Sequence, residues 1–376
     1  MKKVLFLASV LLTGYFAGAQ SITAATGLNK GQINFNDFRV IDSDNLNNST
    51  ILLSKSDKIT IESKETEMSK VCSCGKYIAA MTESLNGDIF YIPMSGQKVM
   101  KIDAVSKTGT QYTFSTVQPD SKDQAGYYAR MTTTPDGYMY ALNNSGTEFL
   151  KISASGSIQN LGAINQFVSK AKELGSETAV YGGDMVADAF GNIYVISASS
   201  HVFKINPNKL SSEYLGQIQG LPAGYTVNGA AVERDGSVLL GTTSKNNSLY
   251  SLNMETLEAT YKADYALAIY DLSSPYFLRQ NEADQLSELS SGYSLYPTVV
   301  KNSQLNIVSN NDIKTVLTVS IWNLNNKQVY TNKVSVKSIG DYQLKLNGSL
   351  LPGIYVLKAV NQEGKEVINT KFTLIQ

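Results

Sequence analysis

Short apolar segments alternate with polar turns through the middle of the chain, and one pattern recurs four times. Each copy begins with a glycine and continues with a mostly apolar run; the glycines are 50, 54 and 45 residues apart, at Gly87, Gly137, Gly191 and Gly236. A second apolar tetrad follows 11 to 13 residues after each glycine, at 99–102, 149–152, 202–205 and 249–252. Apolar runs of this length between turn residues predict β-strands.

A strand with small side chains precedes each of these glycines, at 78–81, 128–131, 182–185 and 228–231. Small side chains suit an inner strand near a crowded axis, and Asp136-Gly137 and Asp235-Gly236 are typical tight-turn pairs. A repeat of 45–54 residues with about four strands is typical of a propeller blade. The sequence therefore predicts an all-β protein with a β-propeller over residues 20–278.

The two ends of this region are expected to close the ring together. Residues 265–271 look like a fifth inner strand without downstream partners, and the stretches at 38–41, 50–53 and 58–61 are predicted to complete that blade. Such closure would hide the sheet edges. We expect five blades, or six if the N-terminal stretch forms a blade of its own, with a short helix inserted at 164–174.

The N-terminus predicts export. Lys2 and Lys3 precede a short apolar run and the small-residue site Ala17-Gly18-Ala19, which together indicate a signal peptide over residues 1–19, with a membrane anchor as the alternative. No later stretch approaches the ~18 apolar residues of a transmembrane helix. Cleavage would leave a net charge of −2, which argues against nucleic acid or an anionic membrane as a partner.

The chain has two cysteines, Cys72 and Cys74. An exported protein meets an oxidising compartment, so the two thiols could pair. Their i, i+2 spacing in a strand is near the outer limit for a disulfide, and a C-x-C pair alone is a poor zinc site. A strained disulfide and free thiols both stay open.

Candidate chemistry is sparse. His201 is the only histidine, without a Gly-x-Ser-x-Gly elbow, and no Walker or His-Glu-x-x-His sequence occurs. Counting seven residues back from the turn glycines gives a mixed inner-strand column that includes Arg130 and Asp184. These two side chains could form an ion pair that holds neighbouring blades, line a small polar pocket, or take part in catalysis. The other candidate ligand-binding residues at the channel mouth are Tyr128, Tyr181, Tyr270 and Asp271.

No cofactor is expected, although channel acids such as Glu83, Asp188, Glu233 and Asp271 raise the alternative of a bound Ca²⁺. Ca²⁺ requires six or more oxygen ligands, and a regular ring of carboxylates is not evident. We therefore predict neither a catalytic residue nor a metal ligand.

A polar linker at 279–292 leads to a domain at 293–376 with about seven short alternating strands, which suggests a small sandwich. Its motifs include Tyr296-Pro297, the strand at 319–323 and a "LPGIYVL" segment at 351–357. This tail resembles the type A C-terminal sorting domain of type IX secretion cargo in Bacteroidota. The family usually has Asn-Pro after Tyr-Pro, whereas Thr298 follows here.

The resemblance implies that the type IX secretion machinery carries the protein to the medium or the cell surface, where the tail is removed or exchanged for an anchor. It implies no activity, because cargoes of many kinds share this tail. We expect a non-catalytic binding protein for a glycan or a protein. The alternatives are an extracellular metal-dependent hydrolase or lactonase that uses the channel acids, and a structural role in the surface layer.

Overall fold

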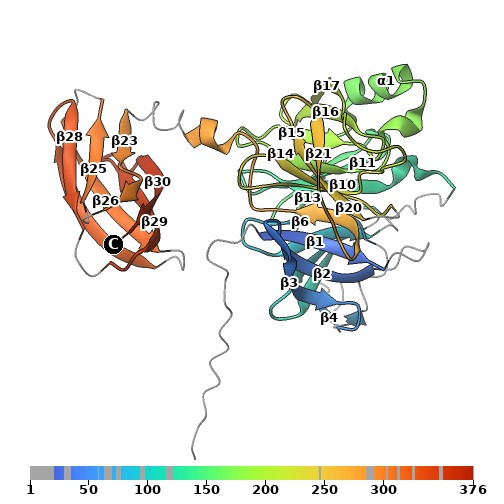
Figure 1. The fold of residues 1–376 in the computed structure, drawn as a ribbon, viewed down its shortest axis with the longest axis horizontal. Coiled ribbons are helices and arrows are strands. Elements are labelled where there is room, and N and C mark those ends of the chain that lie inside the picture. The colour runs from blue at the N-terminus through green and yellow to red at the C-terminus, as the bar shows by residue number, and fades with distance from the viewer. Residues whose placement is uncertain are drawn as a thin grey trace, which may run out of the picture. The chain divides into compact units, whose positions relative to one another are not determined.

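The computed structural model describes residues 21–28, 35–57, 59–62, 70–72, 78–93, 98–115, 122–244, 247–284, 292–301, 304–310, 314–323, 327–346 and 350–375. The predicted signal peptide and Cys74 lie outside these ranges, and the side chain of Cys72 is also outside what is described. The chain divides into two compact units, Met1–Leu278 and Arg279–Gln376 (Figure 1). Within the described ranges, no helix has the length and apolar character needed to cross a membrane.

The first unit consists of five antiparallel-rich sheets, and the expected all-β class is confirmed. Three of them contain four consecutive strands each: β10 (Tyr128–Thr133), β11 (Met139–Asn143), β12 (Phe149–Ile152) and β13 (Ile158–Asn160); β14 (Asp184–Ala187), β15 (Ile193–Ile196), β16 (His201–Asn206) and β17 (Ser211–Gln217); β18 (Gly229–Val232), β19 (Val238–Gly241), β20 (Ser248–Asn253) and β21 (Glu258–Asp264). The repeated glycines lie in the turns between the first and second strands, as the sequence pattern predicts.

A six-stranded sheet contains the first sequence repeat. Its order is β5 (Lys70–Cys72), β4 (Ile59–Glu62), β9 (Thr108–Thr113), β8 (Lys98–Asp103), β7 (Ile89–Pro93) and β6 (Ile78–Glu83). β4 pairs parallel to β9, so the stretch at 58–61 extends this sheet and does not join the closing one as expected. Its apolar residues Ile59 and Ile61 pack into the core of this sheet and its neighbour, which explains the placement.

The closing sheet joins the two ends of the first unit. Its order is β22 (Ala268–Ser273), β1 (Ser21–Gly27), β2 (Phe35–Asp42) and β3 (Asn45–Ser54) (Figure 1). The mixing of N-terminal strands with β22 is confirmed, but sequence reasoning missed β1, which pairs with β22 itself. β1 has a buried run of small and apolar residues, typical of a strand covered on both faces.

The first strands of the five sheets contact one another in a closed cycle, in the order β6, β10, β14, β18, β22 and back to β6. This arrangement is β-propeller-like. The clusters of buried apolar residues lie between neighbouring sheets; one of them combines β14–β16 with the helix α1 (Asn165–Glu173). The expected helix is thus confirmed, and Phe167 and Ala171 form its buried side. Two short 3₁₀ turns, Gln124–Gly126 and Glu177–Val180, precede β10 and β14.

The second unit has two sheets around a core of its own. One has the order β23 (Tyr293–Tyr296), β25 (Gln304–Ser309) and β28 (Gly340–Lys345); the other has the order β24 (Val299–Val300), β30 (Glu366–Leu374), β29 (Gly353–Val360), β26 (Thr315–Asn323) and β27 (Gln328–Val336). The strands alternate buried and exposed residues, so that one face of each sheet packs into the shared core.

Candidate functional site

Three ionisable side chains from the inner strands are fully buried in the first unit. Arg130 lies on β10, Asp184 on β14 and Asp271 on β22, and each has no exposed surface. Arg130 and Asp184 lie seven residues before the turn glycines of their repeats, where the other two repeats have Ala80 and Gly229. The structure thus brings together three of the six candidate residues at one level of the ring.

The two carboxyl groups bind backbone amides of neighbouring inner strands. Asp184 accepts hydrogen bonds from the amide of Ala230 on β18, at 2.7 Å, and from that of Met185, at 2.7 Å. Asp271 accepts one through Oδ2 from the amide of Met81 on β6, at 2.8 Å. An inner strand has no strand partner on its axial side, so its amides need other acceptors, and the carboxyl groups provide them.

The carboxyl groups of Asp184 and Asp271 lie within hydrogen-bond reach of each other. Burial raises the pKa of Asp184, because the charged form loses hydration. Burial followed by the charge of Asp184 raises the pKa of Asp271 still further above its ordinary value. Ionisation of both carboxyl groups would place two like charges together in a buried site, which disfavours the doubly charged state.

Arg130 does not form the expected ion pair with Asp184. Its Nη2 donates to the backbone oxygens of Val180, at 2.7 Å, and Asn144, at 3.1 Å, and its guanidinium lies 5.4 Å from the ring centre of Phe167. Burial lowers the pKa of Arg130 to about 9, and the charge of Asp184 opposes this effect. Arg130 therefore stays cationic at neutral pH and joins the turn after β11 to the 3₁₀ turn before β14.

The space beside these strands is too small for a substrate. A cavity of about 10 Å³ is lined by inner-strand residues and by Tyr276, and it has room for about one water molecule. The segment after β22 crosses here: Ser274 donates to the carbonyl of Val232, and Leu278 pairs with the strand end at Asp188. A proton-sharing acid pair has the chemistry of a general acid and base, but this one lacks access.

A larger groove lies between the six-stranded sheet and the sheet that begins with β10. Its volume is about 300 Å³, and its lining includes Phe114, Tyr128, Glu148 and Asn160. The hydroxyl of Tyr128 donates to Glu148 Oε2 at 2.8 Å, and Asn160 Nδ2 donates to Oε1 at 3.4 Å. The Phe114 and Tyr128 rings meet edge to face, 5.3 Å between centres. Burial, followed by Glu148, raises the pKa of Tyr128, so its hydroxyl stays protonated and donates.

The groove also has small residues along one side. Gly156 lies against the ring of Tyr112; a Cβ there would be 2.0 Å from a ring carbon, so only glycine allows this approach. Of the sequence candidates, only Tyr128 belongs to this groove. Sequence reasoning missed Phe114, Glu148 and Asn160, because they come from the ends of three different strands and no repeat column contains them.

The remaining candidates lie elsewhere. The ring of Tyr270 packs over Gly27, where a Cβ would be 2.2 Å from a ring carbon, and Tyr181 caps a 3₁₀ turn with a half-buried side chain. His201 begins β16, as expected of a strand-end residue, and its Nδ1 lies 3.0 Å from the hydroxyl of Tyr214. These three residues form no common site with the groove. Within the described ranges, no group of three or more His, Cys, Asp or Glu side chains could hold a metal ion.

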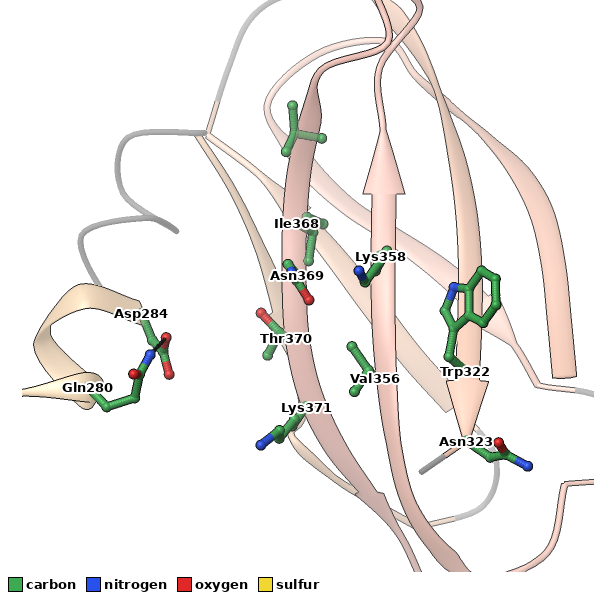
Figure 2. A pocket seen from close by; sticks show the side chains of 11 residues that line it. Gln280, Asp284, Trp322, Asn323, Val356, Lys358, Ile368, Asn369, Thr370 and Lys371 are labelled. Carbon is green, nitrogen blue, oxygen red and sulfur yellow. Dashed lines mark hydrogen bonds between the residues drawn. The ribbon is translucent and has the colours of Figure 1, made fainter. Parts of the chain in front are cut away.

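The second unit has a hollow over the outer face of its five-stranded sheet, about 720 Å³ in volume (Figure 2). Trp322, Val356 and Lys371 form one row across β26, β29 and β30, and Lys358 lies in the next row. Gln280 and Asp284 line the hollow from the other side. Figure 2 shows a broad open space between the two sides, so this is a surface with aromatic and basic side chains and not an enclosed pocket.

Comparisons with known proteins place the repeats in context. The family described as a repeat of unknown function (DUF6923) matches residues 93–270, and no curated protein matches the chain. Among solved structures, a protein of unknown function from Bacteroides caccae is 13% identical, with 94% of each chain covered and a TM-score of 0.37. The extracellular domain of a putative one component system from B. thetaiotaomicron is 12% identical, with 94% of this chain and 50% of that chain covered and a TM-score of 0.35.

Virginiamycin B lyase from Staphylococcus aureus is 11% identical, with 80% of this chain and 85% of that chain covered and a TM-score of 0.32. Similarity at this level says nothing about shared residues or chemistry. The family model matches residues 93–270, which lie within the first unit.

Proposed function

We propose that the protein is an exported binding protein whose five sheets are the blades of a closed propeller, and that it binds a saccharide in the groove around Tyr128 and Glu148. The observation that supports binding is the groove itself, because its polar groups converge on a space of about 300 Å³ at the surface. A cleft of this size with a few convergent polar groups is the usual form of a small-ligand site.

The groove chemistry favours a neutral sugar. Glu148 is exposed, and a carboxylate accepts about four hydrogen bonds, so it has acceptor capacity beyond Tyr128 and Asn160. Hydrogen bonds from sugar hydroxyls to an ionised carboxylate are strong ones. Phe114 and Ile158, which are only partly buried, supply apolar surface for the carbon face of a sugar ring.

A glycan array followed by calorimetric titration of the best ligand tests this proposal. Glu148→Gln should weaken binding about 10- to 100-fold, since hydrogen bonds to charged groups contribute about 1.5–3 kcal/mol. Glu258→Gln makes the same chemical change at an exposed position on β21, away from the groove, and should leave affinity unchanged. An array without any bound glycan, or equal affinity in both variants, would contradict a saccharide site here.

We do not extend the proposal to the hydrolase or lactonase alternative. The inner-strand acids Asp184 and Asp271 are fully buried, and three of their four carboxyl oxygens accept hydrogen bonds from backbone amides. Amide donors around a carboxyl group disfavour a metal ion at the same oxygens.

We further propose that residues 1–19 are a signal peptide and that the second unit is a small sandwich that serves as the type IX sorting domain. The separate core of this unit supports the idea of an independent tail. Deleting residues 296–376 should leave the first unit folded but retained in the periplasm, as measured by fractionation and immunoblotting. Normal release of the truncated protein to the medium would refute the sorting role.

A further inference from the structure

The acid pair at the ring centre leaves one buried polar atom without a protein partner. Asp271 Oδ2 accepts from the Met81 amide, whereas Oδ1 of the same carboxyl group makes no hydrogen bond, although the Leu272 amide lies near both carboxyl groups. Asp184 differs, because both of its oxygens accept from backbone amides. A buried oxygen without a partner costs about 1–3 kcal/mol, so the orphan atom calls for an explanation.

A proton on Asp271 Oδ1 allows this buried oxygen to form a hydrogen bond. Protonated Oδ1 becomes a donor, and the Asp184 carboxylate retains free lone pairs beyond its two amide bonds. The two side chains are within hydrogen-bond reach of each other. This assignment also balances the charge of the buried cluster: Arg130 contributes +1, and the singly protonated pair contributes −1.

We propose that Asp271 carries a proton on Oδ1 and donates it to Asp184, so that the pair forms a pH-sensitive clasp across the ring of inner strands. β14 and β22 are not neighbours in the cycle, yet they contact each other, and the pair joins them directly. Through its amide bonds the clasp also reaches β18 and β6. One proton thus links four of the five inner strands.

Few other ionisable groups face the pair. β6 brings Glu83, whose pKa burial raises, and β10 brings Arg130. β18 and β1 have no ionisable side chain. In the turns beyond β14 and β18, Asp188 binds the amides of its own turn, and Glu233 forms an ion pair with Lys262.

The clasp has a measurable linkage. In the unfolded chain both carboxyl groups have ordinary pKa values. At a pH between these values and the raised pKa of the folded pair, the folded state therefore binds one proton more than the unfolded state. The folded state then loses stability as the pH rises, and the unfolding equilibrium constant grows about tenfold per pH unit from this pair alone. Titration of Glu83 also lowers the stability of the folded state as the pH rises, whereas titration of His201, whose pKa burial lowers, increases it. The test must therefore compare the pH dependence of each variant with that of the wild type.

The test is urea unfolding of the full chain between about pH 5 and about pH 7. Asn at position 271 can keep the donor and the acceptor in place without a titrating proton, so Asp271→Asn should remove the tenfold factor per pH unit. Asp184→Asn puts an amide group opposite two amide donors and should instead destabilise at every pH. Asp44→Asn, in the exposed turn between β2 and β3, is the matched control and should keep the wild-type slope.

The readouts can be separated by unit. Trp322 is the only tryptophan and belongs to the second unit, so its fluorescence should show no change in pH slope in any variant, while circular dichroism follows both units. An unchanged slope in Asp271→Asn, or a stabilised Asp184→Asn, would overturn the assignment. If Asp271→Asn does not fold, infrared spectroscopy of the wild type decides: a protonated carboxyl band at neutral pH supports the clasp, and its absence refutes it.

Discussion

Ring closure by the N-terminal strand β1 leads to a sharp prediction. Ile22 on β1 is fully buried and packs in a cluster with Leu249, Ile269 and Leu272. Ile22→Ala removes three buried carbons, which costs about 2.4 kcal/mol in transfer free energy. The cavity left behind places the loss of stability at about 2–5 kcal/mol.

The matched control is Ile51→Ala on β3, whose side chain is 55% exposed. Exposed substitutions usually change stability by less than about 0.5 kcal/mol. For a domain of this size, Ile22→Ala should lower Tm by about 5–15 °C, and Ile51→Ala by about 1 °C or less.

Differential scanning calorimetry of the full chain measures both variants, and Trp322 fluorescence should show that the second unit is unaffected. If Ile22→Ala melts within about 1 °C of Ile51→Ala, β1 does not belong to the core, and closure of the ring by the chain's two ends is wrong.

Three further predictions concern local packing and metal. Gly183 has a φ of +79°, and a Cβ there would be 1.9 Å from a backbone oxygen, whereas Gly191 has a φ of +80° and open space around it. Gly183→Ala should therefore lower Tm clearly more than Gly191→Ala. Equal melting temperatures would argue against the close approach at Gly183. Phe203 is fully buried, whereas Phe190 is 43% exposed. Phe203→Ala should therefore lower the free energy of unfolding in urea by about 3–5 kcal/mol, and Phe190→Ala by about 0.5 kcal/mol or less. Similar losses in the two variants would place Phe203 outside the core. Addition of EDTA should leave Tm unchanged, and a clear decrease would reveal a structural metal ion.

Much of the repeat architecture is local in origin and therefore visible in the sequence. Turn glycines such as Gly137 need positive φ, and the apolar runs that follow must be buried, so the strands and their spacing are predictable. The helix beginning at Asn165 was equally predictable from its apolar spacing. The strand β1 was not, because its small residues carry no strong strand signal and its partner β22 is more than 240 positions away.

The candidate site shows the same division between local and long-range information. The inner-strand column counted from the turn glycines contained Arg130 and Asp184 but not Asp271, whose strand has no such glycine. Only the tertiary structure decided that Arg130 binds backbone oxygens and that the two acids bind each other, because side-chain direction and burial depend on how sheets pack.

The sequence by itself determined the class of fold and the spacing of the repeat unit, since these follow from local turn chemistry and hydrophobic period. Tertiary structure alone decided where polar groups meet. The groove of Tyr128 and Glu148 joins two sheets, and the Asp184–Asp271 pair joins strands across the ring. The physical reason is that a hydrogen bond or a raised pKa depends on distance and on lost hydration, and neither quantity is encoded in the neighbouring residues of the chain.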